Sequence, residues 1–292
     1  MNGSPPTWAR TGGPPLPPGR RLELARRGTT FVREVAGPPG APTVLLLHGW
    51  VASAGINWFQ VFAPLGRDYR VVAPDLRGHG RGLRTRRIFR LADCADDCAA
   101  TIERLGTGPV IAVGYSMGGP VAQLLWRRHR DLVAGLVLCA TSAGFLPDAR
   151  SRLAFQSWAV AAAAAARAAA FAPRLPPLPL GRARPELLPA WVAAEMRRHD
   201  WRMIVEAGHS IGTYHAGRWI GQVDVPTAVV CTAADRAVPA DLQRAMAEAI
   251  PGADVVEVDD GHLACARPGF ARPLVTALNR VAERAGLAHF PA

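Results

Sequence analysis

The stretch that decides the fold is residues 109–129, PVIAVGYSMGGPVAQLLWRRH. It opens with an uninterrupted apolar run, Pro109 to Val113, which is typical of a strand buried on both faces of a parallel sheet. It continues through Gly114-Tyr115-Ser116-Met117-Gly118 into a segment with helical spacing, Val121 to His129. A Gly-x-Ser-x-Gly pentapeptide between a strand and a helix predicts a sharp turn that projects the serine hydroxyl from the edge of the sheet.

The same alternation of apolar strands and helical segments extends along most of the chain. Residues 22–35 predict a leading hairpin that turns at Arg27-Gly28. Short apolar runs predict further strands at 43–47, 69–73, 136–139, 227–231 and 254–258, and helical spacing predicts helices at 90–105, 240–249 and 269–284. Strands that alternate with helices in this way predict an α/β fold built on a mostly parallel, doubly wound sheet.

One long segment, residues 143–223, interrupts this alternation. It holds no good strand, but it contains an alanine-rich helical stretch at 159–170 and a second helical stretch at 189–208. A simple crossover is much shorter, so we expect a helical cap inserted into the core. The predicted organisation is a flexible Pro- and Gly-rich arm at 1–19, an α/β core at 20–142 and 224–292, and a cap at 143–223.

Three polar residues follow predicted strands in an order that suits nucleophilic catalysis: Ser116, Asp235 and His262. The carboxyl ends of parallel strands meet at one edge of a sheet. There a histidine would take the serine proton, and an acid would hold the imidazole in the required tautomer. Asp148, at the entry of the cap, is a second candidate for the acid. We favour Asp235 because the Val238-Pro239 turn follows it.

Backbone N–H groups are expected to hold the oxyanion that such a reaction forms. The expected donors are Met117, which follows the nucleophile, and Trp50 in the turn His48-Gly49-Trp50 after the strand at 43–47. Apolar side chains near these positions and in the cap predict the walls of an acyl-sized pocket, which suits hydrophobic esters. The predicted substrate-binding residues are Trp50, Tyr115, Phe155 and Trp158.

Together these motifs resemble the α/β-hydrolase superfamily. The resemblance covers residues 20–286 and rests on His48-Gly49, the loop Asp75-Leu76-Arg77-Gly78-His79-Gly80, the serine pentapeptide with Gly119, Asp235 with Val238-Pro239, and Gly261-His262. It implies an eight-stranded sheet, a Ser-His-Asp triad, a lid and no cofactor, with a structural role for the Asp75 loop. Serine at position 116 departs from the subgroups that carry Asp there, which speaks against epoxide hydrolase and haloalkane dehalogenase activity.

The resulting expectation is a serine hydrolase of the carboxylesterase or lipase kind, acting on a small-molecule ester of moderate hydrophobicity. The same triad would also serve an acyltransferase or thioesterase in a biosynthetic pathway, or a hydrolase of carbon–carbon bonds. A non-catalytic binding protein on the same scaffold is the remaining alternative, because fold does not fix function.

Composition narrows the choice of partners. Thirty-four basic residues, all arginine, against 23 acidic ones give a net charge of +11. No aromatic-basic motif accompanies this charge, so we expect no nucleic-acid partner. Weak, salt-sensitive contact with an anionic lipid surface is an open alternative. The six arginines between Arg77 and Arg90 are interpreted as a solvated loop, with a phosphate- or carboxylate-bearing substrate as the alternative.

The five cysteines indicate reduced thiols rather than a disulfide framework, which favours a cytoplasmic setting. Cys94 and Cys98 have the i, i+4 spacing that some metal sites use. No histidine lies close to them in sequence, so we interpret them as small buried side chains and expect no metal. No apolar run suits a secretory signal or reaches the ~20 residues of a membrane span.

Overall fold

The computed structural model describes residues 14–146 and 190–287. Three residues that the sequence analysis singles out, Asp148, Phe155 and Trp158, lie outside these ranges, as do the alanine-rich stretch at 159–170 and most of the N-terminal arm. Their predicted roles therefore stay predictions.

The centre of the fold is an eight-stranded sheet. Its order is β1-β2-β4-β3-β5-β6-β7-β8; β1 and β2 pair antiparallel, β2 and β4 likewise, and the other neighbours are parallel. The predicted α/β class and mostly parallel sheet are thereby confirmed. The strands are β1 Gly19–Leu24, β2 Gly28–Val35, β3 Thr43–Leu47, β4 Arg70–Pro74, β5 Val110–Tyr115, β6 Val133–Cys139, β7 Thr227–Thr232 and β8 Asp254–Val258.

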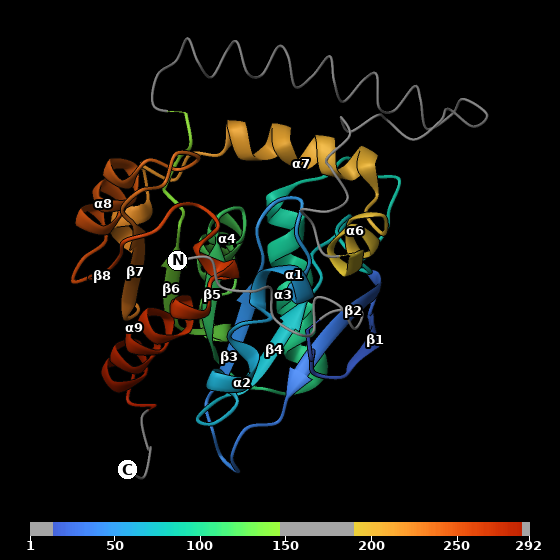
Figure 1. Ribbon diagram of the computed structural model, residues 1–292, viewed down its shortest axis with the longest axis horizontal. Helices are drawn as coiled ribbons and strands as arrows, with labels where there is room; N and C mark the ends of the chain where they lie inside the picture. The colour runs from blue at the N-terminus through green and yellow to red at the C-terminus, as the bar shows by residue number, and fades with distance from the viewer. Residues whose placement is uncertain (1–13, 147–189, 288–292) are drawn as a thin grey trace.

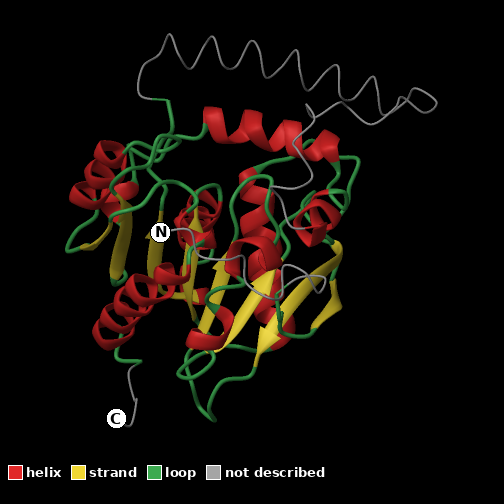
Figure 2. Ribbon diagram, viewed as in Figure 1, coloured by secondary structure: helices red, strands yellow, loops and turns green. Residues whose placement is uncertain are grey.

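Helices cover both faces of the sheet, and Figure 2 shows the strands as one twisted layer between them. One face carries α3 Leu91–Leu105, α4 Gly118–Arg128 and α8 Ala240–Ala249. The other face carries α1 Ala54–Trp58, α2 Phe62–Leu65 and α9 Ala271–Arg284. Single 3₁₀ turns occur at η2 Arg130–Leu132, η3 Ile220–Gln222, η4 Ala264–Ala266 and η5 Pro268–Phe270.

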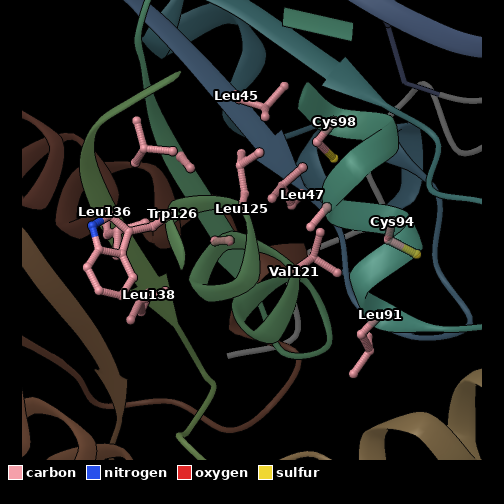
Figure 3. Packing of buried hydrophobic residues seen from close by; sticks show 14 of the residues in the cluster. Leu45, Leu47, Leu91, Cys94, Cys98, Val121, Leu125, Trp126, Leu136 and Leu138 are labelled. Carbon is pink, nitrogen blue, oxygen red and sulfur yellow. The ribbon is translucent and has the colours of Figure 1, made fainter. Parts of the chain in front are cut away.

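The core is divided into two layers because successive strand residues point to opposite faces. In β3, Leu45 and Leu47 pack toward α3 and α4, whereas Val44 and Leu46 pack toward α1, α2 and α9. Figure 3 shows Leu47 between α3 and Leu125 of α4. Both faces are apolar, so these strands carry continuous apolar runs rather than an alternating pattern.

Two further helices, α6 Ala190–Met196 and α7 Trp201–Thr213, lie within the predicted cap. Figure 1 shows α7 running across the edge of the sheet where the parallel strands end. Asp200 caps the start of α7, where its carboxylate accepts a hydrogen bond from the Met203 N–H at 3.2 Å. The division of the chain into core and cap stays a prediction. Within the described residues, no helix is both long and apolar enough to cross a bilayer.

Candidate active site

Ser116 stands on the sharp turn between β5 and α4. Its backbone has φ +51°, the left-handed region that side chains disfavour. The glycines of the pentapeptide permit the turn by close approach: a Cβ on Gly118 would overlap the carbonyl oxygen of Leu47, and one on Gly114 would overlap that of Gly118. The turn therefore requires glycine at these two positions, and it leaves the serine hydroxyl at the carboxyl edge of the sheet.

The structure brings Ser116, His262 and Asp235 into one hydrogen-bonded chain. The Ser116 Oγ lies 3.0 Å from His262 Nε2, and His262 Nδ1 lies 2.8 Å from Asp235 Oδ2. A carboxylate only accepts hydrogen bonds, so His262 carries its proton on Nδ1 and offers Nε2 to the serine. This is the arrangement in which a histidine can act as base toward a serine.

Asp235 is held as a charged, oriented acceptor. Its Oδ1 accepts from the N–H groups of Ala237 and Val238 at 2.8 and 2.9 Å, and its Oδ2 accepts from the Thr232 hydroxyl at 2.8 Å. Burial alone would raise the pKa of this carboxyl, but the hydrogen bonds from His262, Val238 and Thr232 outweigh it and lower the pKa.

A further positioning residue, Gln243 of α8, is absent from the sequence prediction. Its amide donates to the Thr232 hydroxyl at 2.9 Å and to the Val238 carbonyl at 2.7 Å. Both partners touch Asp235 directly. Gln243 therefore holds the loop that carries the acid, and only its place on the helix following that loop could have signalled this role.

Tyr115, predicted to contact substrate, lies elsewhere in the structure. Its side chain is 2% exposed, and its ring packs edge-on against Trp58 and Phe270. Its hydroxyl donates to the carbonyl oxygen of His262 at 2.8 Å. The side chain points into the core because residues alternate along β5. The predicted substrate contact is therefore wrong for Tyr115, which instead ties the loop of His262 to the turn that carries Ser116.

The loop after β3 approaches Ser116 closely. A Cβ on Gly49 would lie 3.4 Å from the Ser116 Cβ. The Gly49 N–H donates to Asn57 Oδ1 at 2.9 Å, and its carbonyl oxygen lies 2.8 Å from His48 Nδ1. Among the described residues, the N–H groups of Trp50 and Met117 donate to no protein acceptor. These two N–H groups are the predicted oxyanion donors.

His48 fixes the peptide that joins Gly49 to Trp50. Its Nε2 accepts from the Leu76 N–H at 2.9 Å, so Nδ1 carries the proton and donates to the Gly49 carbonyl. A peptide's C=O and N–H point in opposite directions, so this bond also sets the direction of the Trp50 N–H. Burial lowers the pKa of His48 to about 4, which keeps the imidazole neutral in this role.

The Trp50 side chain contacts α7. Its indole N–H donates to the Ile204 carbonyl at 2.8 Å, and a Cβ on Gly208 would come within 2.8 Å of the ring. The residue is nevertheless 43% exposed. Trp50 thus joins the loop beside Ser116 to α7 and still presents ring surface to solvent. Its predicted contact with substrate stays a prediction.

The Asp75 loop is a rigid support for this edge of the sheet. The Asp75 carboxylate accepts from the N–H groups of Ala54 and Arg81, each at 2.8 Å. Arg77 is 6% exposed and donates to both oxygens of Asp97, at 2.7 and 2.8 Å. The interpretation of the arginine run as a solvated loop is therefore wrong for Arg77, which forms a buried bidentate ion pair.

Cys94 and Cys98 are buried on the inner face of α3, as Figure 3 shows. Burial raises the pKa of both thiols, which keeps them protonated. Across residues 14–146 and 190–287, no group of three or more His, Cys, Asp or Glu side chains is placed to hold a metal ion.

Comparison with known proteins defines the class. A family model for the alpha/beta hydrolase fold matches residues 42–266, and the chain belongs to this family. A bifunctional esterase/perhydrolase of Acinetobacter calcoaceticus is 40% identical over 103 residues, which are 35% of this chain and 37% of that protein. Epoxide hydrolase B of Mycobacterium tuberculosis is 35% identical over 116 residues, 38% of this chain and 32% of that protein.

The chain thus spans about a third of the length of these curated relatives. The likeness to solved structures is more extensive. A hydrolase from Pseudomonas aeruginosa PA01 superposes with a TM-score of 0.72 over 89% of this chain and 98% of that one, at 22% identity. At that identity the superposition shows a shared fold.

Proposed function

We propose that the protein hydrolyses carboxylic esters of moderately hydrophobic substrates through an acyl-enzyme on Ser116. The observation that carries this proposal is the hydrogen-bonded chain from Ser116 through His262 to Asp235, whose members come from three separate strand ends. The comparison with the esterase/perhydrolase of Acinetobacter calcoaceticus supports the ester as the bond that is cleaved.

In the acylation step the Ser116 oxygen attacks the ester carbonyl carbon while His262 Nε2 takes the hydroxyl proton. The negative charge moves to the carbonyl oxygen, where the N–H groups of Trp50 and Met117 would hold it. The tetrahedral intermediate then expels the alcohol, which receives the proton from His262. Ser116 is left as an ester of the acyl group, and Asp235 stays ionised throughout.

In the deacylation step a water molecule attacks the acyl carbon. His262 takes a proton from this water and returns it to the Ser116 oxygen as the carboxylic acid departs. The net reaction is ester plus water to acid plus alcohol. The lowered pKa of Asp235 serves both steps, because an ionised carboxylate stabilises the imidazolium that forms twice in each cycle.

A nitrophenyl ester series from acetyl to long acyl chains tests this proposal. We expect wild-type turnover and loss of that turnover in Ser116→Ala. Ser142→Ala is the matched control, because Ser142 follows the neighbouring strand and its hydroxyl donates to the Gly144 carbonyl, away from His262. Turnover that survives in Ser116→Ala would refute the proposed nucleophile.

A fluorophosphonate probe distinguishes the alternatives if no ester is turned over. Labelling of Ser116, located by mass spectrometry, would indicate a competent triad that uses another acyl donor or acceptor, as in an acyltransferase or thioesterase. Absence of both turnover and labelling would favour a binding protein on a hydrolase scaffold.

A further inference from the structure

The turn that follows β6 lies beside the turn that carries Ser116. The strands β5 and β6 are parallel neighbours, and Tyr115 pairs with Cys139, so both strands end at the same level of the sheet. The next two residues after β6, Ala140 and Thr141, are fully buried. They are therefore placed to act on the backbone of Ser116 and not to meet solvent.

Residues at the end of β6 hold the backbone of Ser116 on both sides. The Ser116 N–H donates to the Cys139 carbonyl at 2.9 Å, and the Thr141 hydroxyl donates to the Ser116 carbonyl at 2.8 Å. The same carbonyl accepts from the Gly119 N–H at 2.9 Å, at the start of α4. Both backbone polar groups of Ser116 are thus engaged.

The turn after β6 is itself strained. Ala140 has φ +47°, in the left-handed region that side chains disfavour, and its N–H donates to the Val230 carbonyl of β7 at 3.1 Å. A residue stays in this region only where its surroundings hold it there. The contact with α4 is also tight, because a Cβ on Gly119 would lie 2.2 Å from the Thr141 hydroxyl oxygen. A disfavoured backbone and a required glycine therefore accompany the bond from Thr141 to Ser116.

We propose that Thr141 is a positioning residue that sets the direction of the Met117 N–H, one of the two predicted oxyanion donors. The proposal rests on the function proposed above, in which Ser116 is the nucleophile. The Ser116 carbonyl and the Met117 N–H belong to one planar, trans peptide group, so they point in opposite directions. A hydroxyl that fixes this carbonyl therefore fixes the N–H as well.

The other predicted donor is held in the same manner. His48 Nδ1 donates to the Gly49 carbonyl at 2.8 Å, and that carbonyl shares its peptide group with the Trp50 N–H. His48 and Thr141 are both 0% exposed. Each donor peptide is thus set by a buried side chain that lies behind it, on the side away from the N–H.

The direction of an oxyanion donor decides what it contributes to the rate. Removing one donor commonly costs about 10²–10³ in kcat. In Thr141→Val the Met117 N–H remains, and the Gly119 N–H still holds the Ser116 carbonyl, so only part of this effect should be lost. We expect kcat to fall by about tenfold. KM should change by less than about twofold, because the buried hydroxyl does not face bound substrate.

Two substitutions at position 141 separate orientation from stability. Thr141→Val keeps the shape of the side chain and removes the hydroxyl. Thr141→Ser keeps the hydroxyl and removes a buried methyl group, so it should lower the unfolding midpoint by about 2 °C and keep kcat within about twofold of wild type. Thr227→Val is the matched control, because this buried hydroxyl donates to the Val225 carbonyl at 3.0 Å at the amino end of β7. Its kcat should equal that of wild type.

Two rates are measured on each variant: hydrolysis of a nitrophenyl ester and labelling by a fluorophosphonate. In labelling, the Ser116 oxygen bonds to phosphorus, His262 takes the hydroxyl proton, and fluoride departs. Negative charge develops on the phosphoryl oxygen, so the labelling rate depends on the oxyanion donors whether or not the natural substrate is an ester. Thr141→Val should be labelled about tenfold more slowly than wild type, and Thr141→Ser at close to the wild-type rate.

The outcomes distinguish this proposal from the proposed function. Wild-type kcat and labelling rate in Thr141→Val would refute the positioning role and leave the proposed function intact. An equal loss in Thr141→Val and Thr141→Ser would also refute it, because activity would then follow stability. Labelling of Ser116 without ester turnover would refute the proposed function, while slower labelling of Thr141→Val would still support the positioning role. A wild-type chain with neither turnover nor labelling would refute both.

Discussion

The hydroxyl of Tyr115 offers a sharp test of how the candidate site is held together. Tyr115→Phe removes one oxygen atom and keeps the ring that packs against Trp58 and Phe270. The lost hydrogen bond is the one to the His262 carbonyl at 2.8 Å. Because the side chain is buried and does not face the sheet edge, the change should act on the position of the imidazole and not on substrate binding.

The expected magnitude follows from one buried hydrogen bond. Its net contribution to folding is about 1 kcal/mol, which corresponds to roughly 2 °C in the unfolding midpoint of a chain of this size. If the histidine loop loses the same free energy of stabilisation, about 1 kcal/mol, in the transition state, kcat falls by about fivefold. We expect KM to stay unchanged.

Tyr69→Phe is the matched control for this experiment. Its phenol is also buried and donates to Asn279 Oδ1 at 2.7 Å, far along the chain from the three catalytic candidates. It should lower the unfolding midpoint by a similar amount and leave kcat unchanged. The measurements are thermal unfolding and steady-state hydrolysis of a nitrophenyl ester. A Tyr115→Phe enzyme with raised KM and wild-type kcat would refute the positioning role and restore the predicted substrate contact.

Three further predictions concern the turn, the acid and a buried histidine. Gly118→Ala should lower the free energy of unfolding by about 1–3 kcal/mol because the methyl group overlaps a β3 carbonyl; Gly269→Ala, where a Cβ meets nothing, should leave the melting curve unchanged. Asp235→Asn should lower kcat by about 10⁴, because the imidazole is no longer held with its proton on Nδ1; a loss below tenfold would point to another acid. Burial lowers the pKa of His199 from 6.5 to about 4, so the unfolded chain binds the proton first and stability falls as pH drops from 6.5 toward 4. His199→Asn, which keeps an acceptor for the Gly80 N–H, should make that dependence shallower in denaturant titrations, while the buried His48 keeps its own contribution; an unchanged slope would contradict this assignment.

The parts of the fold that could be predicted are those with a repeating local signal. The continuous apolar runs of β3, β5 and β7 and the helical spacing of α3 and α9 follow from burial and can be recognised in short windows. The helices α1 Ala54–Trp58 and α2 Phe62–Leu65 were not predictable in this way, because one turn of helix is too short to show a period. They form where the chain packs Trp58 and Leu65 against the sheet.

The same distinction applies to the candidate site: some of its residues follow from local pattern and others do not. Ser116, Asp235 and His262 each follow a strand, so parallel topology alone places them at one edge. Tyr115, Gln243 and Arg77 differ because their roles depend on partners that local pattern does not reveal. The contact from Tyr115 to His262 joins residues 147 positions apart, and the Arg77 pair with Asp97 requires α3 to lie beside the Asp75 loop.

If Ser116 is the nucleophile, as we propose, activity and stability favour different residues at this position. A serine held at φ +51° carries strain of about 1 kcal/mol that glycine would not carry. Ser116→Gly should therefore unfold at a higher temperature than Ser116→Ala, which keeps the strain. Glycine at position 116 would make the fold more stable but would remove the hydroxyl, so selection for stability alone would replace this serine. In the proposed mechanism, the strained turn is what places the hydroxyl at the sheet edge.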